Sequence, residues 1–304
     1  MATPLDYVKA YVEHEEEIPD FDTSATLYNH CWEIMGDIDR EIKDDFEFLR
    51  QDFPTSEQVR LHEGSILVNR DDIFLGTGAE VKPGALIDAS HGPVYLGANT
   101  KVEPQAAIYG PTYVGPNSVV VAGKVEASSI GHTCRVGGEV EESVFHSYVN
   151  KYHAGFIGHS YVGSWVNFGA MTTNSDLKNN YSSIRVTLNG ESIDTGSIKV
   201  GSFIGDHTKF GIGTLLNTGI NIGLCCNLFG GGLIVDKEVG SFQWGNSGGY
   251  QDYRFDKAIE TARRTAERRD AKLSSSEEQA LKMVADGQSP DKGVLRFQAE
   301  EWSI

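Results

Sequence analysis

The chain has 304 residues, of which 34 are glycine and only 4 are methionine, and its formal net charge at pH 7 is −17. This charge argues against a nucleic-acid-binding protein, which usually carries a basic stripe, and it means that an anionic substrate would need a local basic pocket. The length allows one or two domains.

The N-terminal part is predicted to be an acidic segment followed by a helix. Residues 1–22 are acidic and contain no apolar core of signal-peptide length. From Thr23 to Asp52 apolar residues recur every three or four positions with charges between them, which predicts an amphipathic helix. These residues are Leu27, Cys31, Ile34, Ile38, Ile42 and Phe46. Residues 53–55 end the helix, so we expect residues 1–60 to form a linker or cap.

Residues 61–248 repeat with a period of six. The apolar positions are Leu75, Val81 and Ile87, then Leu96, Val102, Ile108, Val114 and Val120, and finally Ile204, Phe210, Leu216, Ile222, Leu228 and Ile234. Along extended chain every sixth side chain faces the same side, whereas six does not match a helical period. Each unit is therefore a short strand and a turn. Stacked units bury one another's inward residues, so the sequence predicts a β-solenoid.

The repeat loosens between residues 121 and 203. Its spacing drops to five at Val120, Val125 and Ile130 and then recovers at Val136. Such slipping is typical of a loop expelled from the coil, and loops on a rigid scaffold often carry function. We therefore expect the chemistry in this stretch.

The segment Gly211–Val235 has no charged residue and could be mistaken for a membrane span. The six-residue period continues through it, which predicts a coil interior, with Cys225 and Cys226 as small core residues rather than a redox pair. None of the four cysteines forms a CxxC pair, so a zinc site of that type is unsupported. Free thiols fit a reducing compartment, and we expect a cytoplasmic location.

The C-terminal part is predicted to be helical again. Residues 253–272 place Phe255, Ile259, Ala262 and Ala266 on one face. Residues 274–278 read SSSEE, an N-cap signature for a further helix at about 277–286. We expect residues 249–304 to form helices and a tail after the solenoid. Solenoid ends need caps, so the helix at 23–52 should cover the first coil near 61–75, and the helix at 253–272 should lie over or beside the last.

Four segments of the loosened stretch carry its polar residues. They read RVGGEVEES at 135–143, NKYHAGFIG at 150–158, WVNFGA at 165–170 and TTNSDLKNNY at 172–181. With the repeat, this order resembles the hexapeptide-repeat, left-handed β-helix acyltransferases. The closest resemblance is to the acetyltransferase half of the bifunctional N-acetylglucosamine-1-phosphate uridylyltransferases, which acetylate glucosamine-1-phosphate, and to related sugar nucleotidyltransferase-like proteins. The resemblance covers residues 65–245. It implies a mainly β fold, a left-handed parallel β-helix with N- and C-terminal helices.

The resemblance also implies roles for single residues. His153 stands where the family carries its proposed general base. The substrate contacts that we expect are Lys124, Arg135, Glu141, Lys151, Asn167 and Asn174, and the cofactor contacts are Ala170, Gly230, Arg263 and Arg264. Ser143 replaces a family lysine that grips the sugar phosphate, so Lys151 or Lys124 would have to replace it. Phe156 and Ser175 replace two family tyrosines.

These residue types suit acyl transfer from a thioester. The attacking amine must lose a proton, which a histidine accepts near neutral pH. Fixed N–H donors stabilise the oxyanion, and the backbone at Gly169-Ala170 is a candidate. The phosphates of acetyl-CoA, the expected co-substrate, would need arginine or lysine, and Arg263-Arg264 and Arg268-Arg269 are candidates.

A metal site is an alternative reading of the histidines. Left-handed β-helices include the γ-class carbonic anhydrases, which bind zinc with three histidines, and His146, His153 and His159 are clustered in the sequence. No second-shell carboxylate can be assigned to them from the sequence. We therefore expect no metal in this chain.

Two functions remain. The first is an acetyl-CoA-dependent acetyltransferase acting on an amino-sugar phosphate or a nucleotide-linked amino sugar. The second is a non-catalytic β-helical trimerisation scaffold, or the acyltransferase-like half of a sugar-1-phosphate nucleotidyltransferase, although no glycine-rich basic nucleotide loop occurs in the sequence. Three flat faces suit three-fold packing. We therefore expect a homotrimer with a small-molecule substrate and with neither nucleic acid nor membrane as a partner.

Overall fold

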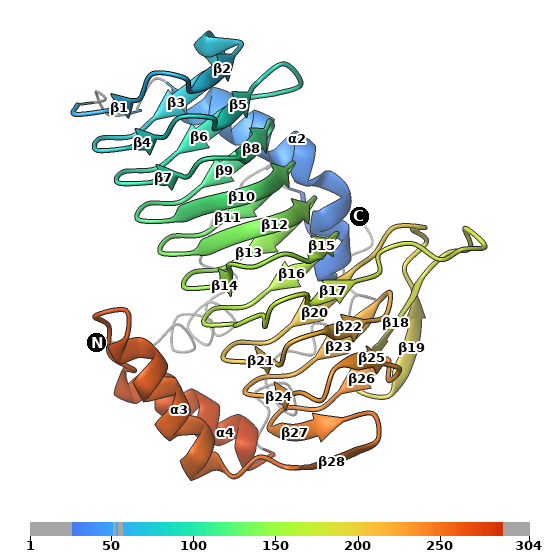
Figure 1. Ribbon diagram of the computed structural model, residues 1–304. Helices are drawn as coiled ribbons and strands as arrows, with labels where there is room; N and C mark the ends of the chain where they lie inside the picture. Colours follow the sequence, from blue (N-terminus) through green and yellow to red (C-terminus); the bar gives the residue numbers. More distant parts are fainter. Residues whose placement is uncertain (1–25, 51–52, 54–56, 288–304) are drawn as a thin grey trace, which may run out of the picture.

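A computed structural model describes residues 26–50, 53 and 57–287 and shows a left-handed parallel β-helix, as the repeat predicts (Figure 1). Successive coils stack along one axis, and each coil contributes a short strand to each of three flat faces. Within the coil, strands pair in parallel with strands of the neighbouring coils; for example, Val102 is in register with Val120, and Phe210 with Leu228.

We call the three faces face 1, face 2 and face 3. Face 1 comprises β1 (Arg60–Leu61), β4 (Glu80–Val81), β7 (Lys101–Val102), the first parts of β10 (Val119–Glu126) and β12 (Arg135–Glu141), β14 (Asn150–Lys151), β21 (Lys209–Phe210), β24 (Asn227–Leu228) and β27 (Gln243–Asn246). Face 2 comprises β2 (Ile66–Val68), β5 (Leu86–Asp88), β8 (Ala106–Tyr109), the second parts of β10 and β12, β15 (Phe156–Gly158), β17 (Thr173–Asn174), β22 (Thr214–Leu216) and β25 (Gly232–Ile234). Face 3 comprises β3 (Ile73–Leu75), β6 (Val94–Leu96), β9 (Thr112–Val114), β11 (Ser129–Ile130), β13 (Val144–Phe145), β16 (Tyr161–Val162), β20 (Ser202–Ile204), β23 (Ile220–Ile222) and β26 (Glu238–Val239).

The apolar residues of the repeat fill the interior of the coil. Every predicted inward position, from Leu75 to Ile234, is at most 4% exposed. The uncharged segment Gly211–Val235 also belongs to the coil and supplies β22, β23, β24 and β25. No helix of the described chain is long and apolar enough to cross a membrane. Cys225 and Cys226 are buried and unpaired, as predicted for small core residues.

Most of the loosened stretch remains in the coil, so the prediction of a single expelled loop was wrong for residues 121–174. Val120 is in register with Val136, and Val136 with Lys151, which makes these coils shorter than eighteen residues. The chain leaves the coil only after β17. There it forms an antiparallel hairpin of β18 (Arg185–Leu188) and β19 (Glu191–Asp194) before it returns at β20.

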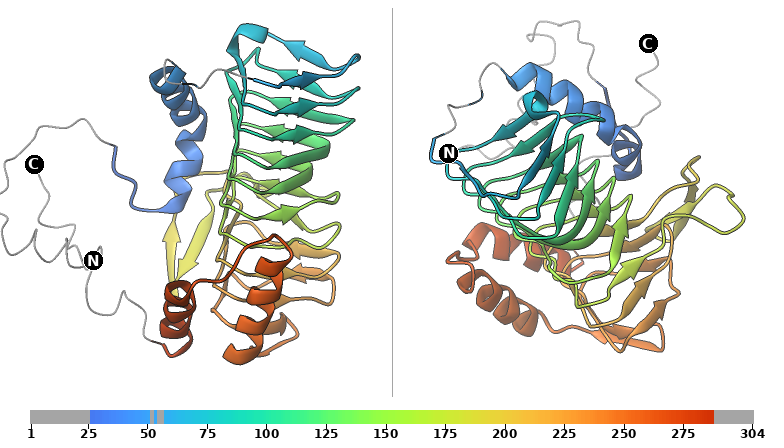
Figure 2. Two further views of the ribbon diagram at one scale, coloured as in Figure 1. Left: turned by 90° about the vertical axis from the view of Figure 1, so that its left-hand side faces the viewer. Right: turned by 45° about the horizontal axis from the view of Figure 1, so that its top comes forward.

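Helix α2 (Cys31–Leu49) lies along the side of the coil rather than over its end (Figure 2). Trp32 packs on Phe203 of face 3, and Phe46 contacts Phe53, which in turn contacts Phe74. The predicted cap on the first coil was therefore wrong, and Ile66 of β2 is 54% exposed. The buried residues of α2 also differ in part from the predicted stripe, because aromatic Trp32 anchors the helix. They are Trp32, Met35, Ile38 and Phe46.

The C-terminal helices lie beside the last coils, as predicted. Strand β28 (Gly249–Asp252) pairs antiparallel with β27, and α3 (Phe255–Glu267) and α4 (Ser275–Ala285) follow it. Ala258 and Ile259 of α3 and Leu281 of α4 pack against Cys225 and Phe242 of the coil. The predicted N-cap of the last helix is confirmed, since the Ser274 hydroxyl accepts a hydrogen bond from the Glu277 N–H at 3.1 Å.

Candidate active site

His153 lies in the turn that joins β14 on face 1 to β15 on face 2. The N–H of Met171 donates to the Ala154 carbonyl, and the N–H of Gly213 donates to the Ala170 carbonyl. Ala170 therefore occupies the same corner one coil further on. Gly230 follows near the same corner, because the N–H of Gly232 donates to the Gly213 carbonyl. The structure thus brings the predicted base and two predicted cofactor residues, Ala170 and Gly230, to one corner.

This corner is recessed just before the His153 turn. The backbone turns from Val102 to Ala106 in one coil, from Val120 to Gly123 in the next, and from Val136 to Gly138 in the third; it widens again between Lys151 and Gly155. Glycines make the tight turns possible: a Cβ on Gly123 would lie 1.9 Å from the Gly138 carbonyl oxygen. The result is a hollow of about 600 Å³. It is lined by Gln105, Gly123, Lys124, Gly138, Glu139, Gly155 and Phe156.

Lys151 points into the coil, at a position that the repeat otherwise reserves for apolar residues. It is 1% exposed, and its Nζ donates to the carbonyl oxygens of Gly137 at 2.9 Å and His153 at 2.7 Å. Burial lowers the pKa of this lysine to about 8. The expectation that Lys151 grips a substrate phosphate does not fit this position, since its ammonium group holds the His153 turn from inside.

Lys124 and Glu141 contact each other on face 2. The Lys124 Nζ lies 2.6 Å from Glu141 Oε1 and also pairs with Glu126. Burial opposes the charge on Lys124, but the two carboxylates outweigh burial and raise the pKa of the lysine. Its positive charge is therefore already compensated, which makes Lys124 a poor partner for a phosphate.

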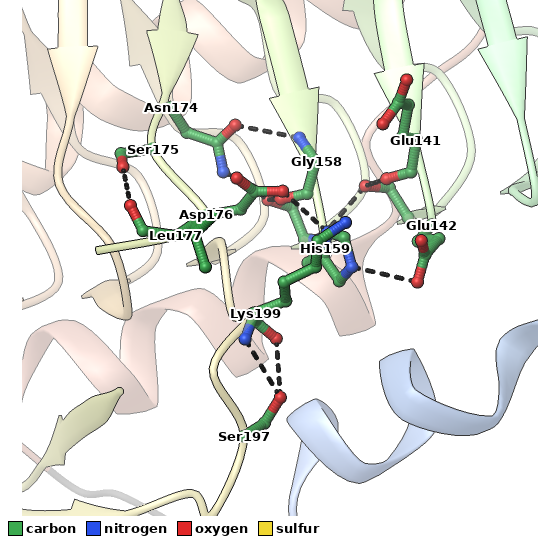
Figure 3. Close-up of polar contacts among 12 residues, drawn as sticks. Glu141, Glu142, Gly158, His159, Asn174, Ser175, Asp176, Leu177, Ser197 and Lys199 are labelled. Atoms are coloured by element: carbon green, nitrogen blue, oxygen red, sulfur yellow. Dashed lines mark hydrogen bonds and ion pairs between the residues drawn. The ribbon is translucent and has the colours of Figure 1, made fainter. Parts of the chain in front are cut away.

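Asn174 is buried, and its side-chain amide bonds to groups of the coil (Figure 3). Its side chain accepts from the Gly158 N–H at 2.9 Å and donates to the Gly158 carbonyl and to Ser160 Oγ. Ser143, at the position of the family lysine, is also buried, and its hydroxyl donates to the Glu141 carbonyl. The expected substrate contact from Asn174 is therefore not supported, because the amide has its partners inside the coil.

A second concave region, which we call the arginine groove, lies between face 1 and α3. It has a volume of about 490 Å³. Its lining residues are Arg135, Tyr148, Asn150, Trp165, Val166, Asn167, Lys209, Thr261, Arg264, Thr265, Arg268 and Arg269. Arg135, Asn167 and Arg264, expected as substrate or cofactor residues, meet here. Arg263 does not, because its guanidinium pairs with Glu278 of α4 at 2.6 Å.

Among the described histidines, His159 alone pairs with two carboxylates. It is 4% exposed, and its ring nitrogens lie 2.8 Å from Asp176 Oδ2 and 3.0 Å from Glu142 Oε2 (Figure 3). Burial opposes protonation, yet the hydrogen bonds to Asp176 and Glu142 raise the pKa of His159 to about 9. The two carboxylates thus favour the protonated form of His159 at neutral pH, which makes it a poor candidate for a general base.

The three histidines of the metal alternative do not converge. His146 bonds to the Tyr161 hydroxyl at 2.7 Å, His159 bridges two carboxylates, and the His153 ring is exposed beside Tyr152. The statement that no carboxylate accompanies them was wrong for His159. In the part of the chain that the structure describes, no group of three or more histidine, cysteine or acidic residues is placed to hold a metal ion.

Comparison with known proteins supports the resemblance in sequence. No protein-family model matches the chain. A bifunctional sugar-1-phosphate nucleotidylyltransferase/acetyltransferase of Sulfurisphaera tokodaii is 31% identical over 153 residues, which cover 46% of this chain and 37% of the relative. The bifunctional protein GlmU of Acaryochloris marina is 29% identical over 180 residues, covering 56% of this chain and 34% of the relative. The chain thus matches little more than a third of the length of these curated relatives.

Solved structures with a similar arrangement include acyltransferases. UDP-N-acetylglucosamine acyltransferase from Campylobacter jejuni is 12% identical, with a TM-score of 0.32, and the match covers 69% of this chain and 92% of that one. A putative acetyltransferase of Bacillus cereus is also 12% identical, with a TM-score of 0.28, and the match covers 74% of this chain and 94% of that one. The sequence relatives confirm the resemblance that the repeat and the histidine motif predict: the chain is similar to part of the bifunctional sugar-1-phosphate nucleotidyltransferase/acetyltransferases.

Proposed function

We propose that the chain is an acetyltransferase that moves an acetyl group from acetyl-CoA to the amino group of an amino-sugar phosphate or a nucleotide-linked amino sugar. The observation that carries this proposal is the position of His153. The histidine is exposed in the turn next to a glycine-lined hollow and in the same corner as Ala170. The names of the sequence relatives, which include acetyltransferase, support the same reaction class.

The proposed reaction needs one base and one oxyanion donor. The amine nitrogen attacks the thioester carbonyl and forms a C–N bond, while the C–S bond breaks and CoA leaves as a thiol. His153 accepts the proton of the attacking amine and returns it to the departing sulfur. The backbone N–H groups at Gly169-Ala170 are the candidate donors to the oxyanion. The small residues that follow along this corner leave room for the extended arm of the cofactor.

The lysine that binds the substrate phosphate in the family is absent from this chain. Ser143 is buried, Lys151 is inside the coil, and Lys124 is neutralised by two carboxylates. Arg135 remains as an exposed cation in register with Asn150, which lies three residues before His153. We therefore assign the phosphate contact to Arg135, with Asn167 as a neighbouring hydrogen-bonding group.

The test is thiol release from acetyl-CoA with a panel of amino-sugar phosphates and nucleotide-linked amino sugars. His153→Ala should lower kcat by about 10²–10⁴-fold, the usual contribution of general acid–base catalysis, and acetyl-CoA binding should change little. His62→Ala is the matched control, because His62 is exposed in the first coil and pairs with Glu80. An unchanged rate in the His153 variant, on an acceptor that the native chain acetylates, would refute the assignment.

The scaffold alternative has its own support. The family lysine is missing, and the Asn174 side chain forms its hydrogen bonds with Gly158 inside the coil. Ile212, Leu233 and Val235 are 75%, 50% and 59% exposed near the end of face 2, where a second copy of the chain could cover them. Absence of thiol release by the native chain with every acceptor, together with a stable trimer, would favour the scaffold.

A further inference from the structure

The arginine groove carries more positive charge than the proposed acetyl transfer uses. Arg264 lines it from α3, Arg268 and Arg269 from the turn that follows α3, and Arg135 and Lys209 from face 1. We propose that the groove is a binding site for a diphosphate group, such as the one that joins the two halves of a nucleotide-type ligand. This proposal concerns binding alone and does not depend on His153.

Most of the guanidinium groups in the groove are uncompensated; the exception is Arg264, which pairs with Glu260 at 2.6 Å. No carboxylate lines it within the described chain, although the protein as a whole has a net charge of −17. Among the described residues no carboxylate lies within ion-pair distance of Arg135, Arg268 or Arg269, whereas Arg40, Arg50 and Arg185 each have at least one. Surface arginines in an acidic protein readily find carboxylates, so three unpaired guanidinium groups at one groove indicate an anion from outside the chain.

The arginines also repel one another. Arg269 is partly buried, and burial together with the nearby Arg135 and Arg268 lowers the pKa of its guanidinium group. Holding like charges together is unfavourable unless an anion lies between them. The free chain therefore keeps an arrangement that a bound anion would stabilise.

The number and kind of donors favour two phosphates over one. Guanidinium groups bind phosphate oxygens in a bidentate manner, and the three that lack a carboxylate partner, on Arg135, Arg268 and Arg269, can surround a diphosphate. Face 1 adds two amides, since the Asn150 Nδ2 donates to Asn167 Oδ1 at 2.8 Å and both side chains lie in the lining. The volume of about 490 Å³ is sufficient for a diphosphate and the groups attached to it.

The packing of α3 keeps the groove in place. Another side of the helix is an apolar stripe whose residues are buried, namely Ala258, Ile259, Ala262 and Ala266. Ala258 and Ile259 of this stripe pack on Cys225 and Phe242 of the coil. The arginine side is therefore held towards face 1 without a second copy of the chain.

Two sources could supply the diphosphate. Acetyl-CoA contains one between its adenosine and pantetheine parts, and a nucleotide-linked amino sugar contains one between its nucleoside and its sugar. Both ligands would place their reactive end towards the His153 turn, because Asn150 in the groove and His153 belong to the same coil.

The experiment is calorimetric titration of the full chain at low salt with inorganic pyrophosphate, and with inorganic phosphate for comparison. Pyrophosphate should bind more tightly than phosphate, and its affinity should fall as salt is raised. The double variant Arg268→Gln, Arg269→Gln should weaken pyrophosphate binding at least about tenfold. Arg254→Gln is the matched control, because Arg254 precedes the same helix, is exposed and pairs with Asp256; it should leave binding unchanged.

Competition identifies the source of the diphosphate. Displacement of pyrophosphate by acetyl-CoA would assign the groove to the donor, and displacement by a nucleotide-linked amino sugar would assign it to the acceptor. His153→Ala should bind pyrophosphate as the native chain does, so a failed acetyl-transfer assay leaves this result intact. The double variant should also unfold at a higher temperature without ligand, because it relieves repulsion. Absence of pyrophosphate binding by the folded native chain, or equal binding by the double variant, would overturn the proposal.

Discussion

Replacing His159 should destabilise the chain in a way that depends on pH. The imidazole bridges Asp176, at the start of the excursion from the coil, and Glu142, at a corner one coil earlier. Its backbone also belongs to the coil, since the Gly201 N–H donates to the His159 carbonyl where the chain returns from the excursion. His159→Gln keeps a side chain of similar size but removes the positive charge.

The magnitude follows from the pKa of the histidine. In the folded chain the pKa is about 9, against an ordinary value of 6.5. Each unit corresponds to about 1.4 kcal/mol, so the protonated form stabilises the fold by about 3 kcal/mol. Because the folded pKa is raised, this contribution is fully present below pH 6.5 and is lost as the pH rises through about 9. The pKa values of Asp176 and Glu142 are lowered, so the stabilisation that these two carboxylates contribute is lost as the pH falls into the acid range.

The assay is urea denaturation of the native chain and the variant at several pH values. The difference in unfolding free energy should be about 3 kcal/mol at pH 6 and under about 1 kcal/mol at pH 9.5. The difference is the informative quantity, because Lys151 and Lys209, whose pKa values are lowered to about 8, act in the opposite direction in both proteins. His132→Gln is the control, since His132 is exposed and its ring bonds to the Thr133 hydroxyl rather than to a carboxylate. A difference that stays constant between pH 6 and pH 9.5 would refute the ion-pair account.

Three further outcomes can be checked with standard measurements. Lys151→Met should lower kcat at least about tenfold, because the His153 turn loses the two hydrogen bonds that hold it in position; the KM for acetyl-CoA should change little. The unfolding free energy of this variant should change by less than about 2 kcal/mol, because the lost hydrogen bonds are offset by the removal of a buried charge. Asn174→Ala should lower the unfolding free energy by about 1–3 kcal/mol, whereas Asn167→Ala should raise the KM for the acceptor and leave stability nearly unchanged; the reverse pattern would contradict their placement. Light scattering should report three times the chain mass of 33.2 kDa, and a monomer at micromolar concentration would contradict the homotrimer.

The repeat predicts the interior of the coil well because one physical constraint acts on every coil. An inward side chain has no space except between its neighbours above and below, so Val102, Val120 and Val136 must all be apolar and similar in size. Lys151 breaks this rule: the sequence predicts it as a substrate contact, but its side chain is buried in the coil. The sequence alone does not show that two backbone carbonyl groups inside the turn accept hydrogen bonds from its ammonium group.

The arrangement of the helices was harder to predict. The stripe on residues 255–266 indicates a buried side, and the structure confirms it, but nothing in the local sequence says which surface that side covers. For α2, Trp32 decides the position by packing on Phe203, far along the chain. The arginine groove depends on the same kind of distant contact. Arg268 and Arg135 become neighbours only after α3 has docked on Cys225 and Phe242.

The loosening of the repeat and the position of His153 have one structural cause. A corner that runs from Val102 to Ala106 in a regular coil is reduced to the step from Val136 to Gly138 two coils later. The missing residues shift the period of the sequence, and their absence makes the surface recede into the glycine-lined hollow. The next corner regains its full length, and it carries His153. The irregular spacing in the sequence therefore marks the coils whose shortened corners form the hollow. A solenoid can form a recess while its chain stays in the coil if a corner loses residues and glycine occupies the positions that remain.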